Sequence, residues 1–178
     1  MGEIVQKSKF LSLVLRHNPG VIGVVMDSEG WVKVCDLCKL MPITKVLLDE
    51  IVVTDSKGRY SYSDDGESIR ANQGHSIDVD VGLRELVGEE VPEYLYHGTA
   101  TRFLKSIWAQ GLLPMTRKHV HLSIDAEVAK DSGARHGKPI ILVVKARILS
   151  KDGYKVWVSS NGVYLMKSVP IGYFEEQG

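Results

Sequence analysis

The chain has 178 residues, with 22 basic and 22 acidic side chains and a formal net charge of zero. This length allows one large or two small domains with hydrophobic cores. The balanced charge excludes an overall positive field that would by itself attract nucleic acid, so any nucleic-acid binding requires a local patch. No signal-like N-terminus or apolar run of about 18 residues is present. We therefore expect a soluble, cytoplasmic protein that is monomeric and does not bind membranes.

The first half of the chain is predicted to form three helices and a hairpin. In chain order we predict a helix over 8–17, a strand over 21–26, a strand over 31–34 with a helix through Leu40, a helix over 43–53, and strands over 59–63 and 68–71. Helices closed by a two-stranded hairpin are the parts of a winged-helix module, although purely structural domains contain the same parts.

A domain boundary is predicted at 87–92, in a segment with glycine, glutamate and proline and little hydrophobic pattern. The expected domains are 1–87 and 93–178. In the second, we predict strands over 94–97, 120–122, 140–146, 155–158 and 163–165, and helices over 101–110 and 126–135. The apolar run Ile140–Val144 indicates a buried central strand. The overall fold class is α+β.

Both cysteines lie in one Cys35-x-x-Cys38 pair, without a second pair to complete a zinc site. We expect no metal, and we expect both thiols to be buried as small apolar side chains.

Basic residues suited to binding phosphate occur at several element ends. Arg16 and His17 end the first helix, Arg59 and Arg70 flank the hairpin, and Arg117 precedes a His-x-His strand. Guanidinium groups bind phosphate in bidentate fashion, so arginines that converged would form a phosphate clamp. The alternative for Arg16 and His17 is a helix C-terminus with solvated basic groups.

Two strand-like runs carry histidines and small polar residues. His119 and His121 alternate and should share a face, with Ser123 next in that series, and an earlier run ends in His97-Gly98-Thr99. These runs indicate a pocket, whereas the alternative is a pair of buried core histidines. The segment 133–137 (Gly-Ala-Arg-His-Gly) could contact a nucleotide through Arg135 or could simply end a helix. Neither a G-x-G-x-x-G turn nor a Walker loop is present.

The segment 69–76 places hydrogen-bonding side chains where the hairpin ends. One alternative is a polar turn with Asn72 and Gly74 at the cap, but the composition of the segment also suits contact with phosphates and riboses. The residues expected to bind RNA are Arg70, Gln73, His75 and Ser76.

Taken together, the motifs around Arg16-His17, 69–76, His97-Gly98-Thr99 and 116–124 resemble the RNA 2'-phosphotransferase family over nearly the whole chain. The resemblance implies an ADP-ribosyltransferase fold for the C-terminal lobe, NAD as co-substrate, and 2'-phosphorylated RNA, expected to be tRNA, as partner. It assigns phosphate chemistry to Arg16, His17, Arg59 and Arg117. It assigns NAD binding to His97, Gly98, Thr99, His121, Ser123 and Arg135. Family members usually have Arg-Phe where this chain has Arg59-Tyr60, a change that keeps the aromatic ring.

The resemblance implies a two-step reaction. The RNA 2'-phosphate joins ADP-ribose as nicotinamide leaves, and the 2'-phospho-ADP-ribosylated RNA then yields 2'-hydroxyl RNA and ADP-ribose 1'',2''-cyclic phosphate. Val163 stands where many protein-modifying ADP-ribosyltransferases keep a catalytic glutamate, which fits a nucleophile that is already anionic. The alternatives are an ADP-ribosyltransferase that caps phosphorylated nucleic-acid ends, or a winged-helix nucleic-acid-binding regulator.

Overall fold

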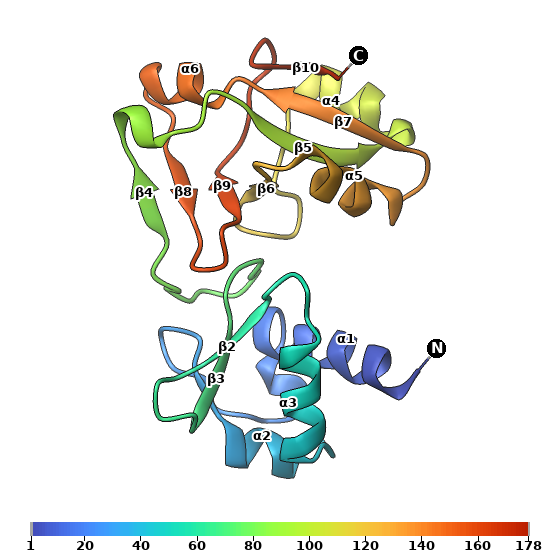
Figure 1. Ribbon diagram of the computed structural model, residues 1–178, viewed down its shortest axis with the longest axis vertical. Helices are drawn as coiled ribbons and strands as arrows, with labels where there is room; N and C mark the ends of the chain where they lie inside the picture. The colour runs from blue at the N-terminus through green and yellow to red at the C-terminus, as the bar shows by residue number, and fades with distance from the viewer. Residues whose placement is uncertain (1, 178) are drawn as a thin grey trace. The chain divides into compact units, whose positions relative to one another are not determined.

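The computed structural model describes residues 2–177, and the chain forms two compact units, Met1–Gly82 and Leu83–Gly178 (Figure 1). Each unit combines helices with antiparallel sheets, which confirms the α+β class. Each also has its own cluster of buried apolar side chains, and the two clusters share no residue. No helix among the described residues is long and apolar enough to cross a membrane.

Unit 1 packs three helices against a small sheet. Its elements are α1 (Glu3–Arg16), the 3-10 turn η1 (Pro19–Val21), β1 (Val32–Lys33), α2 (Val34–Leu40), α3 (Lys45–Val53), β2 (Tyr60–Tyr62) and β3 (Ser68–Ala71). The antiparallel sheet has the order β1-β3-β2, and Tyr60 is opposite Ala71 in the register. The three helices and the hairpin match the parts that the sequence predicts, while the winged-helix assignment stays a prediction.

Helix α1 buries one apolar face. Leu11, Val14 and Leu15 are fully buried at the spacing of a helical stripe. The helix begins at Glu3 rather than at the predicted Ser8, because Ile4 continues the same face and packs against the cluster. Its last residue, Arg16, is therefore placed by the packing of the whole stripe.

The strand predicted over 21–26 is wrong. Pro19 instead begins the short turn η1, and Gly23 has φ +70°, a left-handed conformation that an extended strand does not use. Only Met26 makes a β-bridge there, to Val32. The apolar side chain of Val24 is buried from the turn that follows.

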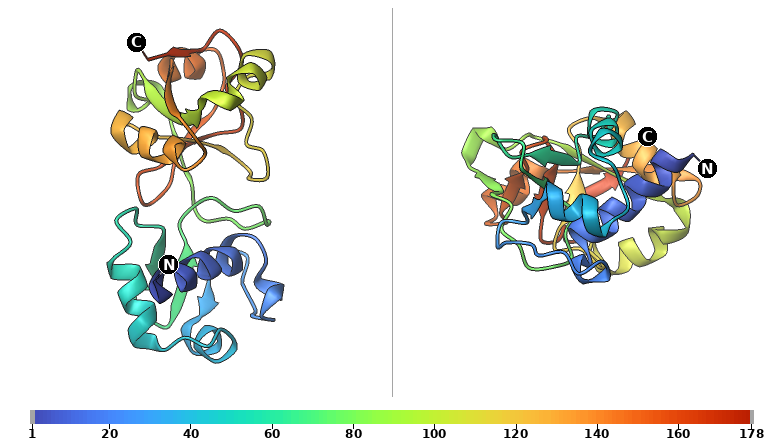
Figure 2. Two further views of the ribbon diagram at one scale, coloured as in Figure 1. Left: turned by 90° about the vertical axis from the view of Figure 1, so that its right-hand side faces the viewer. Right: turned by 90° about the horizontal axis from the view of Figure 1, so that it is seen from below.

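Unit 2 contains two antiparallel sheets. Its elements are β4 (Arg84–Leu86), η2 (Gly88–Glu90), β5 (Leu95–Ala100), η3 (Thr101–Phe103), α4 (Leu104–Gln110), β6 (Val120–Leu122), α5 (Ala126–Ala134), β7 (Pro139–Val144), α6 (Ala146–Lys151), β8 (Val156–Val158), β9 (Tyr164–Met166) and β10 (Phe174–Glu176). The sheet orders are β10-β7-β5 and β4-β8-β9-β6. Within unit 2, α4 and α5 lie on opposite sides of the first sheet (Figure 2).

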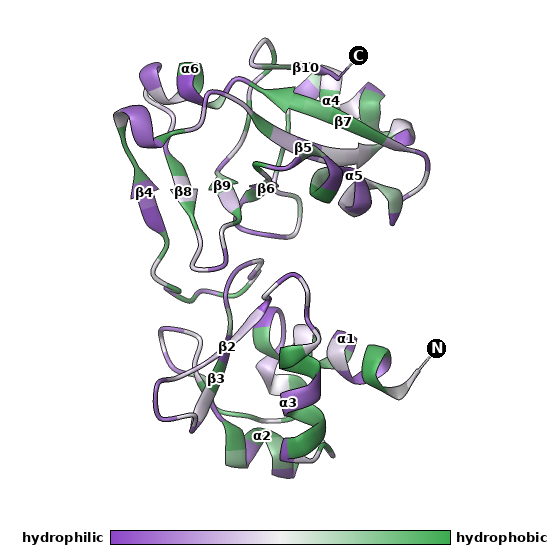
Figure 3. Ribbon diagram, in the orientation of Figure 1, coloured by the Kyte–Doolittle hydropathy of each residue, from purple (hydrophilic) through white to green (hydrophobic). Residues whose placement is uncertain are grey.

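Strand β7 is the central strand of its sheet, as predicted for the apolar run, and Figure 3 shows it as a continuous hydrophobic ribbon. It ends at Val144, earlier than predicted, and α6 follows where the strand was expected to continue. The division after Gly82 precedes the predicted boundary at 87–92, because β4 pairs with β8 and so belongs to unit 2.

Helix α5 lies against β5 with almost no side chain between the two backbones. A Cβ atom on Gly98 would come within 1.6 Å of the Ala129 carbonyl oxygen, and one on Gly133 would come within 2.5 Å of the Thr99 carbonyl oxygen. Gly133 is therefore an interior helix residue that permits close packing. The helix ends at Ala134 with Arg135 as its C-cap, so the segment 133–137 does end a helix, while the contact of Arg135 with a nucleotide stays a prediction.

Candidate functional site

The end of α1 is tied to the segment that follows β3. The Ser76 amide donates to the Arg16 carbonyl oxygen at 3.0 Å, and His17 Nδ1 lies 2.9 Å from Ser76 Oγ. His17 is the C-cap of the helix, and Arg16 is 94% removed from solvent. The structure thus brings together three residues that the sequence predicted from two separate motifs.

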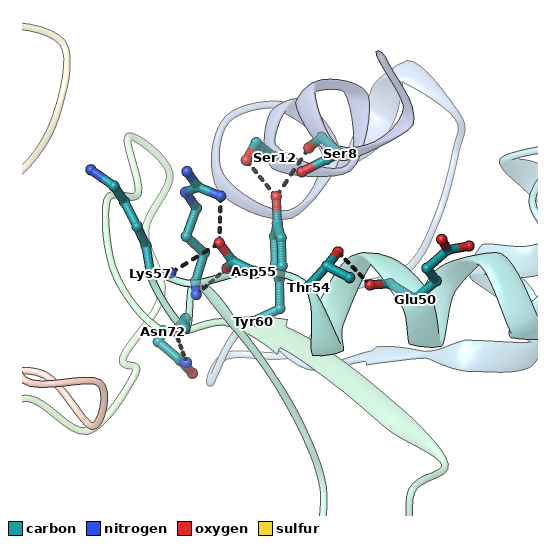
Figure 4. A network of polar contacts seen from close by, with 10 residues as sticks. Ser8, Ser12, Glu50, Thr54, Asp55, Lys57, Tyr60 and Asn72 are labelled. Carbon is teal, nitrogen blue, oxygen red and sulfur yellow. Dashed lines mark hydrogen bonds and ion pairs between the residues drawn. The ribbon is translucent and has the colours of Figure 1, made fainter. Parts of the chain in front are cut away.

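Tyr60 fixes the side of α1 that carries Arg16. The tyrosine hydroxyl donates to the Ser8 carbonyl oxygen at 3.0 Å and lies 2.6 Å from Ser12 Oγ (Figure 4). The Arg16 guanidinium lies 5.9 Å from the centre of the Tyr60 ring. The hydroxyl group of Tyr60 therefore joins β2 to α1, a structural role that the sequence did not reveal.

The predicted RNA-binding segment is mostly buried in unit 1. Gln73 and His75 are 9% and 5% exposed, whereas Ser76 is exposed. Gly30 lies beside His75, since a Cβ on Gly30 would be 3.8 Å from His75 Nε2. Of this group, Ser76 is thus the residue that solvent reaches most readily.

Arg70 lies apart from this group, against the turn before β1. Its guanidinium lies 4.3 Å from the centre of the Trp31 ring, and Nη1 donates to the Glu29 carbonyl oxygen at 3.3 Å. A cation over an aromatic face is attracted by the ring's negative charge distribution. Arg70 therefore stabilises this turn, and its contact with RNA stays a prediction.

Arg59 is held by a carboxylate that the sequence analysis missed. Arg59 Nη1 lies 2.5 Å from Asp55 Oδ1, and the Asp55 side chain is only 3% exposed. The Arg59 amide also donates to Asp55 Oδ2, and the Lys57 amide donates to Oδ1 at 3.3 Å. An aspartate that begins a Gly-containing loop four residues before the arginine is the signal that could have indicated this contact.

Asn72 fastens the other side of the same loop. Its amide donates to the Arg59 carbonyl oxygen at 2.9 Å, and its side-chain Nδ2 donates to the Gly58 carbonyl oxygen at 2.8 Å. Asn72 is 4% exposed, so these bonds are shielded from water. The Arg59 backbone is consequently fixed from two sides, by Asp55 in the loop after α3 and by Asn72 directly after β3.

In unit 2, two histidines form a chain of contacts with backbone carbonyls. His97 Nδ1 lies 3.0 Å from the His121 carbonyl oxygen, and His121 Nδ1 lies 3.0 Å from the His119 carbonyl oxygen. Because a carbonyl only accepts, Nδ1 of each ring carries the hydrogen. Burial lowers the pKa of His97, and the bond to His121 only partly opposes this effect. At neutral pH, His97 is uncharged and its Nε2 is an acceptor.

Strands β5 and β6 bring the predicted NAD-binding residues together. Tyr96 and Ser123 exchange two backbone hydrogen bonds of 2.8 and 2.9 Å, which joins the strand of His97 to the end of the strand of His121. Thr99 is 7% exposed on β5. Gly98 has a clear packing role against α5, so its contact with NAD stays a prediction.

Arg117 and Arg135 form a positively charged pair in unit 2. Surrounding protein atoms lower the pKa of Arg117 by desolvation, and repulsion from the Arg135 charge lowers it further. Among residues 2–177, neither guanidinium has a carboxylate within 4.0 Å. Two like charges that act on each other, with no carboxylate within that distance, favour the binding of an anion.

His119 has a partner that the sequence did not indicate. Its ring meets the Trp157 ring edge to face, with the centres 5.4 Å apart. Desolvation lowers the pKa of His119, as do the charges of Lys118 and Lys167. The cross-strand contact with β8 could not be inferred from local pattern, because it depends on the sheet order.

The cysteines differ from the expectation in part. Cys35 is exposed on α2, so its predicted burial is wrong, while Cys38 is half-buried and burial raises the pKa of its thiol. The part of the chain that the structure describes contains no group of three or more His, Cys, Asp or Glu side chains placed to hold a metal ion. The absence of a metal stays a prediction.

Comparison with known proteins gives one consistent family. Residues 2–168 match the model of "RNA 2'-phosphotransferase, Tpt1 / KptA family". The chain is 46% identical to the "RNA 2'-phosphotransferase" of Escherichia coli strain K12, over 97% of this chain and 96% of that protein. The "Probable RNA 2'-phosphotransferase" of Shigella boydii serotype 18 shows the same identity and coverage. The chain therefore belongs to the RNA 2'-phosphotransferase family.

Proposed function

We propose that this protein is an enzyme that transfers the 2'-phosphate of an RNA to NAD. The products are 2'-hydroxyl RNA, nicotinamide and ADP-ribose 1'',2''-cyclic phosphate. Family membership over nearly the full chain supports the 2'-phosphotransferase activity. The observation that supports the finer proposal is that Arg117 and Arg135, whose charges repel each other, have no carboxylate within 4.0 Å among the described residues, in the unit that also carries His97 and His121.

The residues of unit 2 fit the chemical groups of NAD. Arg135 supplies the charge that a pyrophosphate requires, and Thr99 and Ser123 supply hydroxyl groups. His97 is held neutral with Nε2 as an acceptor, which suits a hydrogen bond from a ribose hydroxyl. NAD supplies the electrophilic carbon C1'' of the nicotinamide ribose as a co-substrate.

The residues proposed to bind the transferred phosphate are Arg16, His17, Arg59 and Arg117. In the first step, an oxygen of the RNA 2'-phosphate attacks C1'', and the C1''–nitrogen bond breaks as nicotinamide leaves. The phosphate is already an anion, so this step requires correct placement rather than a general base. Accordingly, the residues proposed for the phosphate are arginines and a histidine rather than a carboxylate.

In the second step, phosphorus is attacked by the ribose O2'', and its bond to the RNA O2' breaks. The O2'' proton is lost and the departing O2' gains one, so the protons balance. Negative charge on the phosphoryl oxygens rises during this exchange, and fixed guanidinium groups stabilise it. We assign the delivery of the O2' proton to His17, acting through Nε2, because its Nδ1 contacts the Ser76 hydroxyl.

The test is incubation of the purified protein with NAD and an RNA oligonucleotide that carries one internal 2'-phosphate. We expect nicotinamide, 2'-hydroxyl RNA and the cyclic phosphate in equal amounts, and no NAD consumption with the 2'-hydroxyl oligonucleotide. Equal nicotinamide release from both RNAs would refute the assignment. An oligonucleotide with only a terminal phosphate completes the set, because a stable ADP-ribose cap as the sole product would identify the capping reaction instead. A tRNA with a 2'-phosphate at its splice junction then tests the expected substrate.

A further inference from the structure

The Asp55 carboxylate of unit 1 is buried and accepts three hydrogen bonds from its own loop. Its side chain is 3% exposed, and it accepts from the Lys57 amide, the Arg59 amide and Arg59 Nη1. A buried carboxylate is stable when its oxygens receive several hydrogen bonds, and a charged partner strengthens them. The loop 55–59 therefore folds around this one carboxylate (Figure 4).

The contact sets the direction of the Arg59 side chain as well as its backbone. A guanidinium has five N–H donors in one plane, and the Nη1 bond to Asp55 engages one edge of that plane. Arg59 remains 28% exposed on its side chain, so other N–H groups remain available to a ligand. A long, flexible arginine is thereby held in one orientation before any substrate arrives.

From this geometry we propose that Asp55 is the positioning residue of Arg59: it holds the guanidinium in the orientation that binds the transferred phosphate. This inference rests on the proposed function, because it gives Asp55 its purpose through Arg59. Asp55 itself does not touch the substrate. Its negative charge is compensated within the loop by Arg59 and two backbone amides, so the approaching phosphate does not meet an isolated buried anion.

The first experiment compares Asp55→Asn with a matched control, Asp65→Asn. Asp65 also stabilises a turn of the same hairpin, since its Oδ1 accepts from the Glu67 amide at 2.9 Å and from Ser63 Oγ at 2.6 Å, but it holds no arginine. We expect Asp55→Asn to slow the second step by up to about 100-fold, as a catalytic group displaced by about 1 Å does. ADP-ribosylated RNA should accumulate. Asp65→Asn should turn over like the wild type.

The second experiment separates positioning from loop folding by chemical rescue. Guanidinium ion at millimolar concentration should restore part of the activity of Arg59→Ala, because the cation can bind beside the Asp55 carboxylate. The double variant Asp55→Asn, Arg59→Ala should lose this rescue. Its unrescued rate should equal that of Arg59→Ala, since two residues that act as a unit are not additive.

The outcomes distinguish the two levels of the proposal. If the wild type does not consume NAD with 2'-phosphorylated RNA, the proposed function fails before Asp55 is tested. If the wild type is active but guanidinium rescues Arg59→Ala equally with and without Asp55, the positioning role is refuted. An additive loss in the double variant would refute it too. If circular dichroism shows that Asp55→Asn is unfolded, the double variant Asp55→Glu, Arg59→Ala takes its place, because it keeps the negative charge. Guanidinium ion must rescue the activity of this double variant, or the positioning role is refuted.

Discussion

Replacement of Gly98 by alanine tests the contact that places the proposed NAD-binding strand. The added Cβ would lie 1.6 Å from the Ala129 carbonyl oxygen, whereas ordinary contacts begin at 3.4 Å, so helix and strand must separate by about 1.8 Å. The obstacle is helix backbone, which cannot rotate away as a side chain can. Overpacking costs about 1–3 kcal/mol where side chains can adjust. We therefore expect Gly98→Ala to lower the free energy of unfolding by about 3 kcal/mol or more.

The assay is thermal unfolding followed by circular dichroism, with NAD turnover measured on the same samples. For a domain of about 100 residues, 3 kcal/mol corresponds to a loss of roughly 12–24 °C in Tm. Gly153→Ala is the control, because Gly153 has φ +91° but a Cβ there meets nothing within 4 Å. The control should lose only the 1–2 kcal/mol, roughly, of a left-handed alanine. A Gly98→Ala protein within about 1 kcal/mol of the wild type would refute the close packing of α5 on β5.

Three further results are expected. Burial lowers the pKa of His97 below 6.5, so the contribution of its neutral ring to stability is complete above that pH and is lost as the pH falls. The free energy of unfolding, measured from pH 8 to 5, should therefore fall more steeply for the wild type than for His97→Gln. Equal pH dependence of the two proteins would contradict this. Arg117→Ala should slow phosphate transfer by about 10²–10³ and accumulate ADP-ribosylated RNA on a gel, whereas Thr99→Ala should slow both steps without a trapped species. The variant with Cys35→Ser and Cys38→Ser should keep turnover largely intact and resist chelators; a folded but inactive variant would show that the cysteines have a chemical role.

Elements with a strong local pattern could be predicted from the sequence. The α3 stripe and the hairpin strands β2 and β3 follow from periodicity and the turn between them, and β3 spans Ser68–Ala71 as predicted. Helix α6 was missed because Ala146, Ile148 and Leu149 continue the apolar run of β7 and resemble more strand. Strand β10 was missed because its short sequence Phe174–Glu176 ends in two glutamates, and only its pairing with β7 makes it a strand.

The candidate site shows the same limit. Chemistry-bearing residue types could be found in the sequence, but their partners depend on tertiary packing. Ser76 meets His17 across 59 residues of sequence, and Trp157 on β8 meets His119, which precedes β6, although β9 lies between β8 and β6 in the sheet. The sequence indicated a ligand contact at Gly98, which stays a prediction, but it did not indicate that the Ala129 carbonyl of α5 packs against this glycine. The only sign of such a close backbone contact in a sequence is the glycine itself, which does not show what lies against it.

The positions of the three tryptophans allow intrinsic fluorescence to report on each unit separately. Trp31 is the tryptophan of unit 1 and lies under the Arg70 guanidinium, while Trp108 stacks on Phe174 and Trp157 meets His119 in unit 2. Indole fluorescence responds to charge and solvent at the ring, so each unit carries a signal of its own. With Trp108 and Trp157 replaced by phenylalanine, fluorescence from Trp31 would test the proposed binding of RNA to unit 1. The reciprocal variant, which keeps only Trp157, would test the proposed binding of NAD to unit 2 without an attached dye.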